Sequence, residues 1–406
     1  MGDGSVKFVE QNLLNTDLTL NLSQNIPWTG GSLFLETSAQ RMDLFSEHKY
    51  SWQTSPIMIG YRQSLFGYNS LKWDKRIEPV RYQEAKKNYV ETLELVSANA
   101  INKFFALATA QSNYDIASFN YANADTLYRY AQGRYNIGTI TENEMLQLEL
   151  NRLTEETNRM NARIEMDNCM QELRSYLGIQ EEREIRVRVS SRIPNFSINL
   201  NEALALAYEN SPDIQTMKRR KLESESAVAR ARANAGLKAD IYLRFGLTQT
   251  ADKLPEAYRN LLDQQYVSLS ISLPILDWGR GKGQVRVARS NRDLVYTQVE
   301  QSRTDFELNV RKLVKQFNLQ TQRVRIAART DETAQRRNEV ARKLYILGKS
   351  TILDLNASIS EKDSARRNYV SALYNYWSLY YTLRSMTLYD FESNKLLTED
   401  YNLLIE

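Results

Sequence analysis

Five short segments of the chain alternate hydrophobic and polar residues, and an alternation with a period of two predicts β-strands. The first segment is residues 17–24 (DLTLNLSQ), in which Leu alternates with Asp, Thr, Asn and Ser. The other four fall into two pairs, one at about 31–66 and one at about 238–276. Within these pairs the predicted strands are residues 32–42, 55–66, 238–250 and 265–276.

The segments that follow each pair of strands are far longer and have a helical pattern. Between Lys72 and Arg134, apolar residues such as Ile101, Phe105 and Ala108 recur every three or four positions, as on one face of a helix. At 1.5 Å per residue, a helix of roughly sixty residues is about 90 Å long, which exceeds the core of an ordinary domain. Further helices are predicted at about 141–177, 199–210, 213–235, 282–346 and 351–391.

The two halves of the chain align with each other at one offset of 210 residues, which pairs Lys72 with Lys282 and Tyr135 with Tyr345. A single offset across two long helices indicates the duplication of a unit of two strands, a helix, a turn and a helix. A chance similarity between two unrelated hairpins is the alternative. The predicted organisation is a first repeat at 1–178 (strand pair about 31–66, helical hairpin about 72–178), a connector with equatorial helices at 179–235, a second repeat at 236–391 (strand pair about 238–276, hairpin about 282–391) and a C-terminal tail at 392–406.

The start of the chain lacks two features that its second half leads us to expect. Helices at 199–235 precede the second strand pair, but no helical pattern precedes the first pair. Residues 1–4 contain neither the basic region nor the apolar region of a secretory signal peptide. We therefore expect a missing upstream helix in the first repeat, with a signal peptide before it.

The most specific local signal is the turn that joins the two helices of each hairpin. Gly138 and Gly348 occupy the point where a helix must end, a position that favours a left-handed glycine. Thr141 with Glu144 three residues later forms the pattern of a capping box, and Thr351 with Asp354 forms a weaker version of it. Each turn exposes one apolar residue, so it is either a solvated corner or a docking tip for another protein. The tip residues are Tyr135, Ile137, Gly138 and Thr141 in the first hairpin and Tyr345, Leu347, Gly348 and Thr351 in the second.

Composition excludes several classes of function. A single cysteine, Cys169, excludes an intrachain disulfide and a zinc or iron–sulfur site built on cysteines, and the single His48 argues against a histidine-rich metal site. The net charge of +4 is too small to indicate nucleic acid as a partner. The sequence GRGKG at 279–283 lacks the spacing of a phosphate-binding loop. With no convergent carboxylate pair, we predict no enzyme activity and no cofactor.

Four motifs together resemble the TolC-like outer-membrane efflux family. They are SLPILDWGR at 272–280, NEALALAYENSPDI at 201–214, AQGRYNIGTITENEML at 131–146 and ARKLYILGKSTILDL at 341–355. The resemblance covers about 31–391 and implies a mostly helical protein with β-strands that works as a homotrimer. Each subunit of such a trimer gives four strands to one twelve-stranded barrel in the outer membrane, and the helices continue as a tunnel through the periplasm.

The same resemblance implies a function. Members of the family are export ducts of Gram-negative bacteria that carry small molecules or polypeptides in tripartite efflux or type I secretion systems. A periplasmic adaptor, or membrane fusion protein, links such a duct to an inner-membrane pump, and lipid of the outer membrane surrounds the barrel. Family members often narrow the tunnel with acidic residues near the tips, and Asp354 matches one such position, so it is a candidate gate residue. Glu144 occupies the equivalent place in the other hairpin and is the second candidate. The tip residues become candidates for docking the adaptor.

A soluble coiled-coil scaffold, or a periplasmic adaptor protein, remains the alternative because such proteins also contain long helical hairpins. The alternating strands separate the two hypotheses. A scaffold has no use for paired amphipathic strands at equivalent places in both halves, whereas a membrane barrel needs them.

Overall fold

The computed structural model describes residues 12–180, 184–190, 193–194, 196–347 and 349–397. The chain forms two compact units, each assembled from two stretches of sequence. One unit comprises residues 1–83 and 215–302 and holds the large sheet. The other comprises residues 84–214 and 303–406 and holds both helical turns that the sequence singles out.

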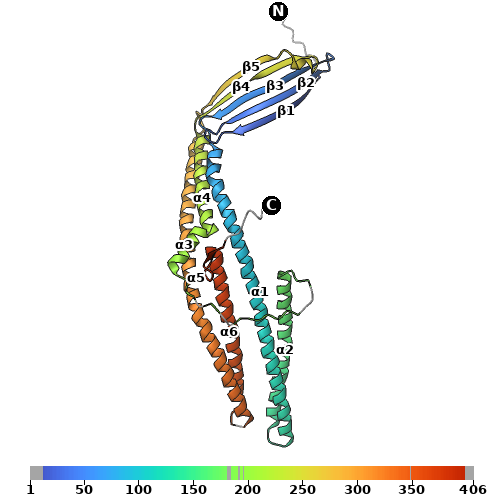
Figure 1. The fold of residues 1–406 in the computed structure, drawn as a ribbon, viewed down its shortest axis with the longest axis vertical. Helices are drawn as coiled ribbons and strands as arrows, with labels where there is room; N and C mark the ends of the chain where they lie inside the picture. The colour runs from blue at the N-terminus through green and yellow to red at the C-terminus, as the bar shows by residue number, and fades with distance from the viewer. Residues whose placement is uncertain (1–11, 181–183, 191–192, 195, 348, 398–406) are drawn as a thin grey trace, which may run out of the picture. The chain divides into compact units, whose positions relative to one another are not determined.

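The sheet is antiparallel and has five strands in the order in which they occur in the chain (Figure 1). Its strands are β1 (Leu13–Asn25), β2 (Ser32–Leu44), β3 (Lys49–Ser64), β4 (Lys238–Ala251) and β5 (Leu262–Ser272). The two predicted strand pairs are therefore present and lie in one sheet, with β3 next to β4.

The segment predicted as a separate strand at 17–24 joins the same sheet as a fifth strand, a place that the sequence did not predict. β1 pairs with β2 over its whole length, from Leu13 opposite Leu44 to Asn25 opposite Ser32. The edges of the sheet are consequently β1 and β5 rather than β2 and β5.

The helices follow the predicted boundaries within a few residues. They are α1 (Ser70–Asn136), α2 (Glu142–Tyr176), α3 (Leu200–Asn210), α4 (Pro212–Ala235), α5 (Arg280–Ile346) and α6 (Ile352–Thr387). α1 and α5 each have 67 residues and begin 210 residues apart, as do α2 and α6. This equal spacing confirms the duplicated strand–strand–hairpin unit. None of the helices among the described residues is apolar over a stretch long enough to cross a membrane.

Two apolar clusters hold the helical unit together. Between α1 and α2, Leu107 and Ala110 pack against Met166 and Leu173. Cys169 packs at the border of this cluster and is half-buried rather than buried. Between α5 and α6 the core is aromatic, with Phe317 lying 5.1 Å from Tyr376 and 6.0 Å from Tyr380 between ring centroids. Aromatic rings bury more area per residue than aliphatic side chains, which suits a two-helix interface with few layers.

The last helix is shorter than predicted. It was expected to continue to about Phe391, but α6 ends at Thr387, where Leu388 takes a left-handed conformation with φ of 47°. A small hairpin of β6 (Tyr389–Asp390) and β7 (Lys395–Leu396) follows. An ion-pair network accompanies this turn, in which the guanidinium of Arg384 contacts Asp390 at 3.6 Å and Glu94 of α1 at 3.0 Å. Aromatic periodicity alone does not reveal such an ion-pair network.

Candidate functional sites at the hairpin tips and on the sheet

The first hairpin tip is a capped turn with an exposed apolar residue. Gly138 has φ of +71°, and its backbone N–H donates to the carbonyl of Tyr135 at 2.9 Å. Thr141 and Glu144 form a complete capping box, in which each side chain accepts a hydrogen bond from the other residue's backbone N–H. These hydrogen bonds hold the turn without help from the Ile137 side chain. That side chain is 74% exposed and takes no part in the core.

The second tip repeats this arrangement. Leu347 is 66% exposed, and its backbone N–H donates to the carbonyl of Lys343 at 3.1 Å. Thr351 and Asp354 also form a complete capping box, so the expectation that the aspartate version is the weaker match was wrong. Gly348 lies outside the described residues.

Asp354 is exposed, and among the described residues its carboxylate accepts more hydrogen bonds than that of Glu144, the other candidate gate residue. Its Oδ2 accepts from the Thr351 hydroxyl at 2.7 Å and from the Ser350 hydroxyl at 3.3 Å. These hydrogen bonds from the Thr351 side chain and backbone lower the pKa of Asp354 below its ordinary value, so the group is ionised at neutral pH. Glu144 occupies the equivalent position of the first hairpin and caps Thr141 in the same way.

A cavity of about 450 Å³ lies beside the second tip, between α1, α5 and α6. Leu347 and Leu355 contribute apolar side chains, and Arg134 and Arg342 contribute positive charge. Tyr345 also lines the cavity, whereas its counterpart Tyr135 does not. The structure thus places two tip residues, Tyr345 and Leu347, beside the end of α1. The exposed Leu347 is one of the residues that line the cavity.

The sheet has one exposed apolar face. Directly paired residues share a face, and the pairs Leu22–Leu35, Leu35–Ile59, Ile59–Phe245 and Leu243–Val267 carry this face from edge to edge. The extra residue of a β-bulge lies in β3 between Thr54 and Ile57, where Pro56 cannot donate to the ladder. What we call the apolar face consists of Leu18, Leu20, Leu22, Leu33, Leu35, Ile57, Ile59, Phe245, Val267, Leu269 and Ile271, all of them exposed.

The opposite face of the sheet is polar and internally paired. Glu36 lies 4.0 Å from Arg244, and the guanidinium of Arg62 lies 5.5 Å from the centroid of the Tyr242 ring. Phe34 and Met58 are buried apolar residues of this face, and Phe34 stacks on Tyr242 with centroids 5.7 Å apart. Gly60 is required below it, because a Cβ at this position would lie 2.0 Å from Cζ of Phe34.

A border of aromatic and charged residues ends the apolar face near the turn between β2 and β3. Arg41 lies on the same face as Leu33 and Leu35, and its guanidinium is 5.2 Å from the Tyr50 ring and 5.7 Å from the Trp52 ring. Aromatic rings beside charged groups are the composition found where a membrane barrel meets the lipid headgroups.

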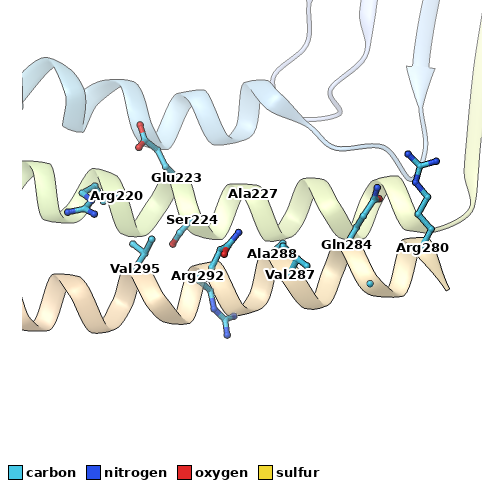
Figure 2. Close-up of a pocket in the computed structure, with 12 residues that line it drawn as sticks. Arg220, Glu223, Ser224, Ala227, Arg280, Gln284, Val287, Ala288, Arg292 and Val295 are labelled. Carbon is cyan, nitrogen blue, oxygen red and sulfur yellow. The ribbon is translucent and has the colours of Figure 1, made fainter.

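A second hollow, of about 670 Å³, lies between α4 and α5. Figure 2 shows Val287, Ala288 and Val295 of α5 facing α4, whereas Arg292 points away. Three of its four charged residues have partners: Glu223 binds Arg81, Arg292 binds Asp293, and Arg220 donates to Gln298. The surface of the hollow is mostly apolar, which suits contact with another helix better than the binding of a polar ligand.

The remaining candidate chemistry has structural explanations. The carboxylate of Asp277 accepts hydrogen bonds from the backbone N–H groups of Gly279 and Gly281, both at 2.8–2.9 Å. These bonds lower the pKa of Asp277 and occupy the donors that a phosphate would need. The described part of the chain has no group of three or more His, Cys, Asp or Glu side chains placed to hold a metal ion.

Comparison with known proteins agrees with this geometry. The family model described as outer membrane efflux protein matches residues 203–387. The resemblance to outer-membrane efflux proteins is confirmed. Members of this family are channels rather than enzymes. A search of curated protein sequences gave no match.

The efflux-channel fold extends over nearly the whole chain. The outer membrane channel CmeC of Campylobacter jejuni superposes with a TM-score of 0.68 at 15% identity, over 98% of this chain and 80% of that one. VceC of Vibrio cholerae gives 0.64 at 14% identity, over 93% and 87%. The open state of MtrE of Neisseria gonorrhoeae gives 0.66 at 13% identity, over 96% and 82%.

Sequence reasoning missed the cavity beside the second tip and the pairing of β1 with β2. The cavity joins residues from three helices that are distant in sequence, so no local pattern marks it. The alternation in residues 17–24 did predict a strand, but alternation does not identify the strand's partner.

Proposed function

We propose that this protein is the outer-membrane duct of a tripartite efflux or type I secretion system, and that it works as a homotrimer. The observation that carries the proposal is the sheet, with eleven exposed large apolar residues on one face and paired charges on the other. An exposed apolar face of this kind needs lipid or protein to cover it. The charged opposite face suits a water-filled lumen.

Closure of the sheet requires more than one copy. Five strands are too few to close a pore, and their two edges leave unpaired backbone groups. Three copies that join edge to edge supply enough strands for a barrel with an aqueous interior. In this proposal the helical unit lies in the periplasm, the tips bind the adaptor, and the adaptor connects the duct to an inner-membrane pump.

Purification from membranes tests the proposal and its alternative together. We expect the protein to require detergent for extraction, to migrate as a trimer, and to bring with it an adaptor and an inner-membrane pump, identified by mass spectrometry. The soluble scaffold predicts the opposite: recovery in the aqueous fraction without detergent. A monodisperse monomer in mild detergent contradicts the trimeric duct.

The gate hypothesis gives a separate prediction. If the three Asp354 side chains of a trimer face its axis, their charges attract cations and resist close approach. Because hydrogen bonds lower the pKa of Asp354, the charge should persist at mildly acid pH. We expect Asp354→Asn to weaken cation selectivity and block by multivalent cations, measured by single-channel conductance in planar bilayers between pH 5 and 8.

The variant to compare is Glu144→Gln, which removes the carboxylate of the other candidate gate residue and disturbs the equivalent hairpin cap. Both substitutions disturb a capping box, so a general loosening of the helix ends should affect both variants alike. A selectivity change in Asp354→Asn alone supports the axial gate. Unchanged selectivity and block in both variants leaves Asp354 as a helix cap.

A further inference from the structure

β1 is an edge strand that buries little side-chain surface against the rest of the described structure. Every one of its thirteen residues is exposed, and within the part of the chain that the structure describes its one partner strand is β2. Leu20 remains 71% exposed although it stands opposite Thr37 of β2. β1 is therefore held by its backbone ladder and by little side-chain burial.

The direction of the strands makes β1 incompatible with a uniformly antiparallel ring of identical copies. Neighbouring strands in the sheet alternate in direction, so β1, β3 and β5 run one way and β2 and β4 the other. If β1 stays in place, β5 of one copy meets β1 of the next in a parallel arrangement. If β1 leaves, β5 meets β2, and every junction in the ring is antiparallel.

β1 and β5 also present the same side-chain pattern. In β1, Leu18, Leu20 and Leu22 alternate with Thr, Asn and Ser, and in β5, Val267, Leu269 and Ile271 alternate with Ser. Both strands place their apolar residues on the apolar face, and both run antiparallel to the strand beside them. β5 of a second copy therefore fits beside β2 in the place of β1, antiparallel to β2 and with its apolar residues on the apolar face.

From these observations we propose that β1 is an exchangeable strand, which covers the edge of β2 in the single chain and is displaced by β5 of a second copy. The proposal rests on the trimer proposed above. Exchange replaces one ladder on β2 by another, so it costs few hydrogen bonds, and closure then removes the free edge of β5. Before assembly, β1 protects β2 from pairing with unrelated strands.

The turn between β1 and β2 suits the role of a pivot. Its residues 26–31 form a closed turn, with the N–H of Ile26 donating to the carbonyl of Gly31 at 2.8 Å. Side chains from the body of the unit hold the turn, because the amide of Gln63 donates to Thr29 and that of Asn69 donates to Pro27. Among the described residues, no side-chain hydrogen bond of this kind joins β1 to the body, so β1 can leave while the turn stays.

A disulfide lock tests the exchange. In a Cys169→Ser background, Thr19→Cys with Ser38→Cys places two cysteines at paired positions of β1 and β2. Gln40→Cys with Gln53→Cys gives the matched control, a lock between β2 and β3 that leaves β1 unconstrained. We expect the β1 lock to lower the yield of trimers at least tenfold under oxidising conditions, with recovery on reduction, while the control lock forms trimers like the parent.

An intermolecular cross-link provides the second measurement. Ser38 and Ser270 lie on strands three positions apart in the sheet, about 14 Å at the spacing of β-strands, so cysteines at these positions cannot join within one chain. We expect Ser38→Cys with Ser270→Cys, or with the neighbouring Ser268→Cys or Ser272→Cys, to form covalent dimers and trimers.

The outcomes separate the two proposals. Trimers that form normally with β1 locked overturn the exchange and leave the trimeric duct standing. Failure of the parent and of the control lock to form any trimers overturns both. A block by the β1 lock alone, together with a cross-link from β2 to β5, supports the exchange.

Discussion

A Leu269→Arg variant is expected to lose its trimers from the outer membrane, whereas Ser268→Arg, one residue away on the same strand, is expected to retain them. Leu269 lies on the apolar face and is 60% exposed. Ser268 lies on the opposite face, where it stands beside Tyr242. An arginine on the lipid side of a membrane barrel costs ~2–4 kcal/mol near the bilayer midplane, and a trimer contains three copies of it.

The comparison isolates the effect of the face on which the arginine lies, because both variants add the same charge to the same strand. Membrane fractionation and the trimer band on unheated gels measure the result. Equal loss in both variants indicates that β5 tolerates no large side chain. Equal retention contradicts the assignment of the apolar face to lipid, and with it the proposed membrane location of the sheet.

The sequence predicts the elements of this fold well because each is governed by a local rule. Alternating residues predicted the strands, and the caps at Thr141 and Thr351 predicted the starts of α2 and α6. The duplication helped, since a boundary found in one half supports the same boundary in the other. Errors occur where long-range contacts accompany the change of structure, as at the end of α6, where Arg384 pairs with Glu94 of α1.

The candidate sites also divide into features that a local rule predicts and features that depend on distant parts of the chain. Exposure of Ile137 and Leu347 follows from turn chemistry and was predicted. The apolar face was only partly predictable, because its continuity depends on the register of five strands and on the bulge near Pro56. The strand at 17–24 was predicted, but its place beside β2 was not. Its sequence shows that it is amphipathic, whereas its position depends on the free edge of β2.

Replacing both Ile137 and Leu347 by aspartate is expected to abolish export while the protein still forms trimers in the outer membrane. Both side chains are exposed, and the turns are held by backbone bonds and capping boxes that the substitutions leave intact. The folding cost should therefore be small, as for other exposed sites. A charge at the centre of an apolar docking contact, in contrast, loses its hydration without gaining a partner.

The matched control is Asn136→Asp with Lys349→Gln, which changes the net charge by the same amount at neighbouring exposed positions but keeps both apolar residues. Export measured as resistance to a pumped compound, and cross-linking to the co-purified adaptor, should be lost only in the first variant. If both variants fail alike, charge at the tips is what matters, and the contact with the adaptor is electrostatic. If export survives Ile137→Asp with Leu347→Asp, the tips are solvated corners, and the adaptor binds elsewhere on the helices.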